Sequence, residues 1–74
     1  MNWWNWKLAG LNVTAMYMRL FHVSGRVLES RLIRKTGDIC HTIELNNPIT
    51  IYGKILKRIF VQHDEITWVG NPAK

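Results

Sequence analysis

The sequence has 74 residues, ten of them Lys or Arg against five Asp or Glu, so its formal net charge is +5. A chain of this length has room for one domain and buries about 60% of its unfolded surface, so its core alone leaves it marginally stable. One Cys excludes an internal disulfide, and one Cys with three scattered His gives no zinc-binding pattern. We therefore expect one domain over residues 1–74, a homo-oligomer without metal or cofactor, and a reducing, cytoplasmic location.

Residues 1–10 are predicted to form a short helix. Trp4, Leu8 and Leu11 fall at helical spacing, and Gly10 stands where a left-handed C-cap would end the helix. A helix this short is unstable alone and has to dock, so we expect Trp4 to pack inward.

The chain from residue 11 to residue 69 is predicted to form strands, because apolar residues recur with a period of two. Residues 12–22 are apolar on both faces, which predicts a strand covered on both sides. Ser24 and Gly25 then predict a turn. Residues 70–74 are expected to be a frayed tail.

Further turns divide the second half of the sequence. The segment KTGD (35–38) predicts a hairpin whose glycine adopts positive φ, and NNP (46–48) predicts a break because proline cannot continue a central ladder. Gly53 predicts a sharp bend. Residues 54–62 are rich in β-branched side chains and are predicted as strand rather than helical turn, and residues 66–69 as the last strand. The expected fold is mainly β: the short helix, then five or six antiparallel strands in a bent sheet that closes into a small barrel.

Two segments resemble the Sm-like family, which includes bacterial RNA chaperones and spliceosomal ring proteins. FHVSGRVLESRLI (21–33) is similar to its pattern of an apolar strand, a turn glycine (Gly25) and a second strand. IYGKI (51–55) is similar to an aromatic-plus-basic segment near the last strands of bacterial members. The resemblance implies an SH3-like or Sm-like barrel with a short N-terminal helix. It also implies that Tyr52 and Lys54 help to hold uridine-rich RNA.

The sequence departs from the family pattern in three places. Ser30 stands where the family has a second glycine, and the basic segment at 34–37 replaces an acidic residue. The predicted strand at 65–69 exceeds the five-strand plan of the family.

Basic residues gather in two stretches of the sequence. If the predicted second and fifth strands approach each other, six of these residues form one basic face that suits phosphate groups. Otherwise they are two solvated flanks on different sides of the molecule. On the first interpretation we expect a non-catalytic regulator that binds single-stranded RNA or DNA, with Tyr52 stacking on a base. The six residues are Arg31, Arg34, Lys35, Lys54, Lys57 and Arg58.

The alternative is a protein-interaction module, such as a phage- or plasmid-type adaptor or inhibitor. Trp3 and Trp6 share a face of the predicted helix, and with Tyr17 they would dock on an acidic partner protein. Trp68 is expected to be a core or interface anchor. Lys7 and Arg19 interrupt the apolar N-terminal region, so no membrane span is expected.

Catalytic residues are not predicted. His63, Asp64 and Glu65 are adjacent polar residues that are typical of a surface turn. Cys40 and His41 are neighbours in a predicted strand, so their side chains face opposite sides and cannot share a proton. We therefore expect that the protein is not an enzyme.

Overall fold

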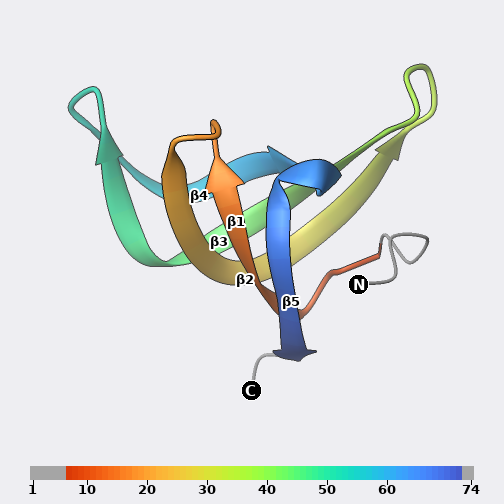
Figure 1. The fold of residues 1–74 in the computed structure, drawn as a ribbon, viewed down its shortest axis with the longest axis horizontal. Coiled ribbons are helices and arrows are strands. Elements are labelled where there is room, and N and C mark those ends of the chain that lie inside the picture. Colours follow the sequence, from red (N-terminus) through yellow and green to blue (C-terminus); the bar gives the residue numbers. More distant parts are fainter. Residues whose placement is uncertain (1–6, 73–74) are drawn as a thin grey trace.

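The computed structural model describes residues 7–72, and most of them belong to one antiparallel sheet (Figure 1). The strand order is β4-β3-β2-β1-β5. The elements are β1 (Leu11–Tyr17), β2 (Phe21–Ile33), β3 (Asp38–Ile51), β4 (Lys54–Gln62), the 3-10 helix η1 (His63–Glu65) and β5 (Ile66–Pro72). The prediction of a mainly β fold is confirmed, with five strands.

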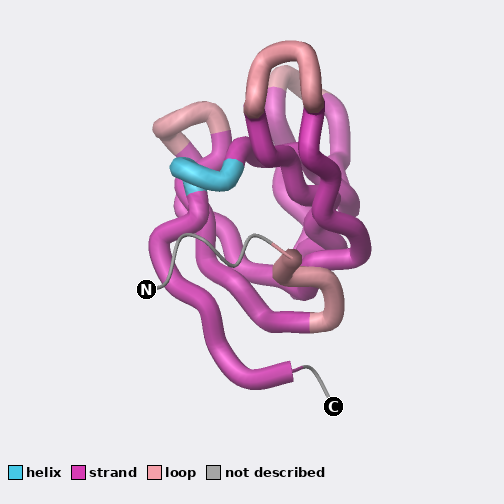
Figure 2. Tube along the Cα trace, turned by 90° about the vertical axis from the view of Figure 1, so that its right-hand side faces the viewer, coloured by secondary structure: helices cyan, strands magenta, loops and turns pink. Residues whose placement is uncertain are grey.

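The outer strands of the sheet are β4 and β5. No ladder joins them within residues 7–72, so the hydrogen-bonded sheet is open. The sheet is nevertheless curved around one concave side (Figures 1 and 2), and β1 contacts β4 across that side. Closure of the sheet into a barrel stays a prediction.

The concave side of the sheet holds the hydrophobic core. Alternate residues of each strand point to this side, as the period of two requires. The buried core residues are Leu8, Val13, Ala15, Val23, Val27, Ile43, Leu45, Ile59, Val61 and Ile66. Every strand contributes at least one of them, so one core ties the whole sheet together.

The predicted N-terminal helix lies mostly outside the described residues, since positions 1–6, including Trp4, are not among them. Residues 7–10 are not helical. Gly10 has a φ of 88°, the positive value expected of a C-cap, but its N–H donates to the Val27 carbonyl of β2 instead. Leu8, which follows the predicted helix face of Trp4, is buried. Within residues 7–72 there is no helix of the length and apolar character needed to cross a membrane.

The predicted strand over residues 12–22 is wrong, because a tight turn divides it. β1 ends at Tyr17 and the chain reverses through Met18 and Arg19, with φ of 53° and 58°. The Leu20 N–H donates to the Tyr17 carbonyl over 3.1 Å and closes the turn. Two consecutive positive φ values match the right-handed twist of the flanking strands, which favours this turn even without glycine.

The predicted turn at Ser24 and Gly25 is also wrong. Gly25 lies within β2, where it pairs with Val13 of β1 and Leu45 of β3. A Cβ atom at this position would collide with the carbonyl oxygen of Glu44. Glycine is required here because the backbones of β2 and β3 approach closely at this position.

The later turns are largely as predicted. Gly37 and Gly53 have φ of 74° and 77° in the β2–β3 and β3–β4 connections, and residues 54–62 form β4. The predicted break at 46–48 is seen in the pairing of β3 with β4, which is interrupted between Glu44 and Ile49, but β3 itself does not end there and continues to Ile51. β5 continues to Pro72, beyond the predicted end of the sheet at residue 69.

Candidate nucleic-acid interface

An exposed basic strand forms one edge of the sheet. Among residues 7–72, β4 pairs only with β3, so its other side is an edge of the sheet. Lys54, Lys57 and Arg58 are all exposed on this strand. Tyr52, in the turn that leads into it, is 92% exposed, and Phe60 is 74% exposed. We call these five residues the basic edge.

The structure brings together only part of the predicted basic face. β3 lies between β2 and β4, so the two basic stretches are not on adjacent strands. Arg34 and Lys35 are exposed in the β2–β3 turn. Figure 1 shows this turn and the β3–β4 turn at opposite ends of the molecule. The predicted residues that lie together are Tyr52 and the three cations of β4.

Arg31 of β2 differs from the β4 cations because it is held in an ion pair. Its Nη2 lies 3.0 Å from Oε1 of Glu29. Arg26 pairs in the same way with Glu44, at 3.6 Å. Both ion pairs are substantially exposed, so each contributes little to stability. Their effect is to offset positive charge on this part of the sheet.

Phe60 belongs to the basic edge although it was not among the predicted binding residues. Its neighbours Ile59 and Val61 are both 2% exposed, so they point into the core. Phe60 must then point outward, because neighbouring strand residues face opposite sides. The alternation Ile59, Phe60, Val61 was the signal that could have identified it.

The predicted protein interface receives no support from Tyr17, which is half-buried and packs against the core. Trp3 and Trp6 lie outside the described residues. Trp68 is 56% exposed, so a core position is wrong for it. A Cβ atom at Gly70 would collide with the six-membered ring of Trp68, so the indole lies close to this glycine.

A hydrogen-bonded row of polar groups crosses the concave side. Ser30 Oγ accepts from the Leu8 N–H at 3.0 Å and lies 2.8 Å from His41 Nδ1. His41 Nε2 lies 2.8 Å from His63 Nδ1. His41 is 1% exposed. Burial, and then the nearby charge of His63, lower the pKa of His41 from 6.5 to about 4.

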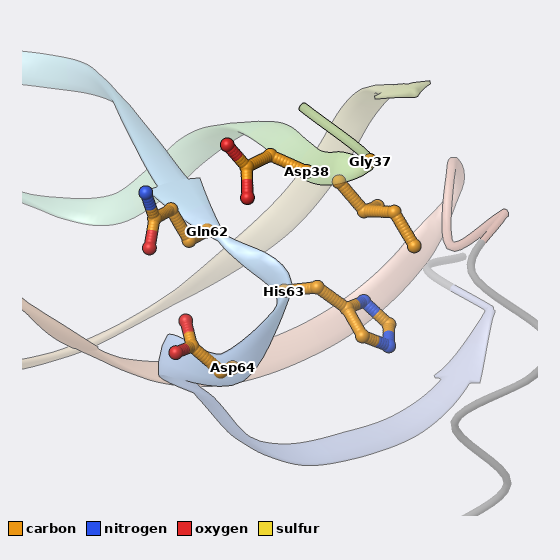
Figure 3. A pocket seen from close by; sticks show the side chains of 6 residues that line it. Gly37, Asp38, Gln62, His63 and Asp64 are labelled. Atoms are coloured by element: carbon orange, nitrogen blue, oxygen red, sulfur yellow. The ribbon is translucent and has the colours of Figure 1, made fainter. Parts of the chain in front are cut away.

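His63 also lines a pocket of about 410 Å³ between the β2–β3 turn and η1 (Figure 3). The carboxyl groups of Asp38 and Asp64 in this pocket lie away from the His63 imidazole. Glu65 is occupied as well, since its Oε1 accepts the Gln62 N–H at 2.8 Å. The predicted surface turn at 63–65 is thus a 3-10 helix whose histidine is half-buried.

Cys40 and His41 are neighbours on β3, and their side chains lie on opposite sides of the sheet. Cys40 is half-buried on the outer side of β3, whereas His41 is buried on the concave side, as the alternation predicts. Among residues 7–72, no three His, Cys, Asp or Glu side chains are placed to hold a metal ion. Comparison of the chain with family models, curated proteins and solved structures gives no match.

Proposed function

We propose that this protein binds single-stranded nucleic acid along the basic edge. The observation that carries the proposal is that three exposed cations of β4 lie between two exposed aromatic side chains, Tyr52 and Phe60. Single-strand binding combines cations that follow the phosphates with aromatic rings on which bases stack. The nine residues of β4 span about 30 Å, which is long enough to follow several nucleotides.

The resemblance to the Sm-like family favours RNA over DNA. The predicted strand at 65–69 was counted as one strand more than the five of the family. The structure has five strands, because residues 38–51 form one strand instead of two. The curvature of the sheet supports an SH3-like or Sm-like barrel in which β4 and β5 approach each other. The family pattern has a turn glycine between two strands, whereas Gly25 lies within β2.

The test is fluorescence anisotropy with labelled single-stranded RNA and DNA over a salt series. Lys57→Glu should weaken binding about fivefold or more and reduce the slope of log affinity against log salt by about 0.7, the value for one phosphate contact. Arg19→Glu is the matched control, because it makes the same charge change at an exposed position in the β1–β2 turn.

Equal losses in these two variants would mean that net charge alone attracts the nucleic acid, and the basic edge would be rejected as the site. Failure of the folded wild-type protein to bind either nucleic acid at low salt would reject the function itself. Stronger binding of RNA than of DNA is the result expected from the family resemblance.

A protein partner is the second candidate function, and the exposed Trp68 is the observation that favours it. Large aromatic side chains at the surface are frequent anchors of interfaces. An acidic partner would contact Trp68 together with the N-terminal Trp3 and Trp6, and the basic residues would accelerate association. Trp68→Ala should then abolish capture of the partner, whereas Lys57→Glu should mainly slow its association.

A further inference from the structure

A groove lies on the outer side of the sheet, across β2, β3 and β4. Thr42 of the middle strand is paired with Phe60 on one side and with Glu29 on the other. Cys40, also on the middle strand, is paired with Arg31 of β2. Small residues on β3 between larger ones on its neighbours leave a trough, because adjacent strands are about 4.8 Å apart. Its volume is about 300 Å³, and it is lined by Glu29, Arg31, Ile33, Cys40, Thr42 and Phe60.

One wall of this groove carries the aromatic ring of Phe60, and the other carries the guanidinium of Arg31, which a hydrogen-bonded partner orients. Arg31 donates from both Nε and Nη2 to Oε1 of Glu29, at 3.3 and 3.0 Å. This contact uses one edge of the planar guanidinium, the edge formed by Nε and Nη2, and holds the group in a fixed orientation. The outer end of the guanidinium still carries two parallel donors for a ligand. They are one N–H of Nη1 and the second N–H of Nη2.

The shape and the donors together define the ligand. Phe60 offers a stacking surface to a flat ring, and the two parallel donors require two adjacent acceptors on the edge of that ring. Guanine presents such a pair at N7 and O6, and cytosine presents one at N3 and O2. Adenine alternates an acceptor with a donor on its N7 side. Uracil has a donor between its two carbonyl groups.

We propose that the groove of Phe60 and Arg31 is a base-specific subsite for guanine or cytosine within a single strand bound along the basic edge. This inference rests on the proposed function, because the β4 cations hold the phosphates of the same strand. Phe60 belongs to both sites, so a base can turn into the groove while its backbone follows β4. Glu29 is a positioning residue, since it acts through Arg31.

The experiment compares four labelled RNA octamers: oligouridine, and oligouridine with one central guanine, cytosine or adenine. The wild-type protein should bind the guanine or the cytosine octamer about fivefold more tightly than the uridine and adenine octamers. Arg31→Lys keeps the charge but removes the planar guanidinium, so it should abolish this preference for guanine or cytosine over uridine and adenine. Arg26→Lys is the matched control, because Arg26 is also ion-paired and exposed, with Glu44.

The outcomes separate the two proposals. Equal affinity for all four octamers, a preference for adenine, or a preference that survives Arg31→Lys would overturn the base-specific subsite while single-strand binding stands. Absence of binding to any octamer by the folded protein would overturn both. Whichever of the guanine and cytosine octamers binds more tightly identifies the base.

Discussion

His41 is a buried histidine with a partner at each ring nitrogen, Ser30 at Nδ1 and His63 at Nε2. A neutral imidazole has one N–H and one acceptor nitrogen. If the Ser30 hydroxyl donates to Nδ1, then Nε2–H donates to His63, and the opposite tautomer reverses both bonds. Either neutral tautomer of His41 can form both hydrogen bonds, to Ser30 and to His63. A proton on both ring nitrogens would instead place a buried cation beside His63.

We predict from this row that stability falls between pH 6.5 and about pH 4. In that window the unfolded chain protonates His41, whose ordinary pKa is 6.5, and the folded protein does not until about pH 4. Stability from this residue is therefore complete above pH 6.5, is lost as the pH falls, and levels off below about 4. The pKa difference corresponds to about 3 kcal/mol, and urea unfolding at a series of pH values measures it.

His41→Gln should flatten the pH dependence of stability, whereas His22→Gln, at an exposed position of β2, should leave the slope as in wild type. An unchanged slope in His41→Gln would show that other groups cause the acid sensitivity. The comparison uses slopes, so a general loss of stability in His41→Gln does not obscure it.

At the level of the elements, two hairpin turns contain residues that normally avoid their backbone conformation. Met18 and Arg19 form the β1–β2 turn, and Tyr52 precedes Gly53 in the β3–β4 turn, all with positive φ. A side chain larger than that of Asn or Asp in this region costs about 1–2 kcal/mol. At Tyr52 the strain is combined with almost full exposure and a position in the basic edge.

We predict that Tyr52→Asn stabilises the protein and weakens binding. Asparagine tolerates positive φ, so the free energy of unfolding should rise by about 0.5–1 kcal/mol. Loss of a base-stacking ring should lower the affinity for single-stranded nucleic acid about fivefold or more. Urea unfolding and anisotropy on the same sample measure the two effects.

Arg19→Asn is the control for Tyr52→Asn, since it relieves the same strain in the β1–β2 turn. It should give a similar gain in stability with a much smaller change in affinity. If Tyr52→Asn binds as tightly as wild type, Tyr52 does not contribute stacking.

The turns also show which elements the sequence could predict. Gly37 and Gly53 stand at positive φ, where glycine is the expected residue, and both turns were predicted. The turn at Met18 and Arg19 contains no residue that favours positive φ, so local propensity could not find it. Gly25 misled the prediction because a glycine needed for close backbone approach looks the same in sequence as a turn glycine.

At the level of the whole molecule, strand order decided how much of the candidate site could be predicted. Tyr52, Lys54, Lys57 and Arg58 were predicted and lie together because they are close in the sequence. Their grouping with Arg34 and Lys35 depended on strand adjacency. Periodicity carries no information on adjacency, and β3 proved to separate the two stretches. The pairing of His41 with His63 was missed for the same reason, since the two residues are far apart in sequence.

The two open edges of the sheet lead to a prediction about assembly. β4 carries cations that repel a second β4, whereas residues 66–72 of β5 contain no charged side chain. We therefore expect self-association through β5, seen by light scattering as a mass above 8.7 kDa that rises with concentration. Thr67→Lys should reduce this association, and Thr42→Lys, on an inner strand and paired on both sides, should not. A constant monomer mass over the whole concentration range would contradict the prediction.

The pairing of β1 with β5 has a consequence for synthesis of the protein. β5 is the last strand of the sheet to be translated, yet its partner is the first, with Leu11 opposite Pro72. On the ribosome, β1 to β4 can form hairpins while one side of β1 stays bare and Ile66 is missing from the core. Translation of β5 therefore completes the sheet, and until then the nascent chain presents a strand edge on β1 that chaperones or neighbouring chains can occupy.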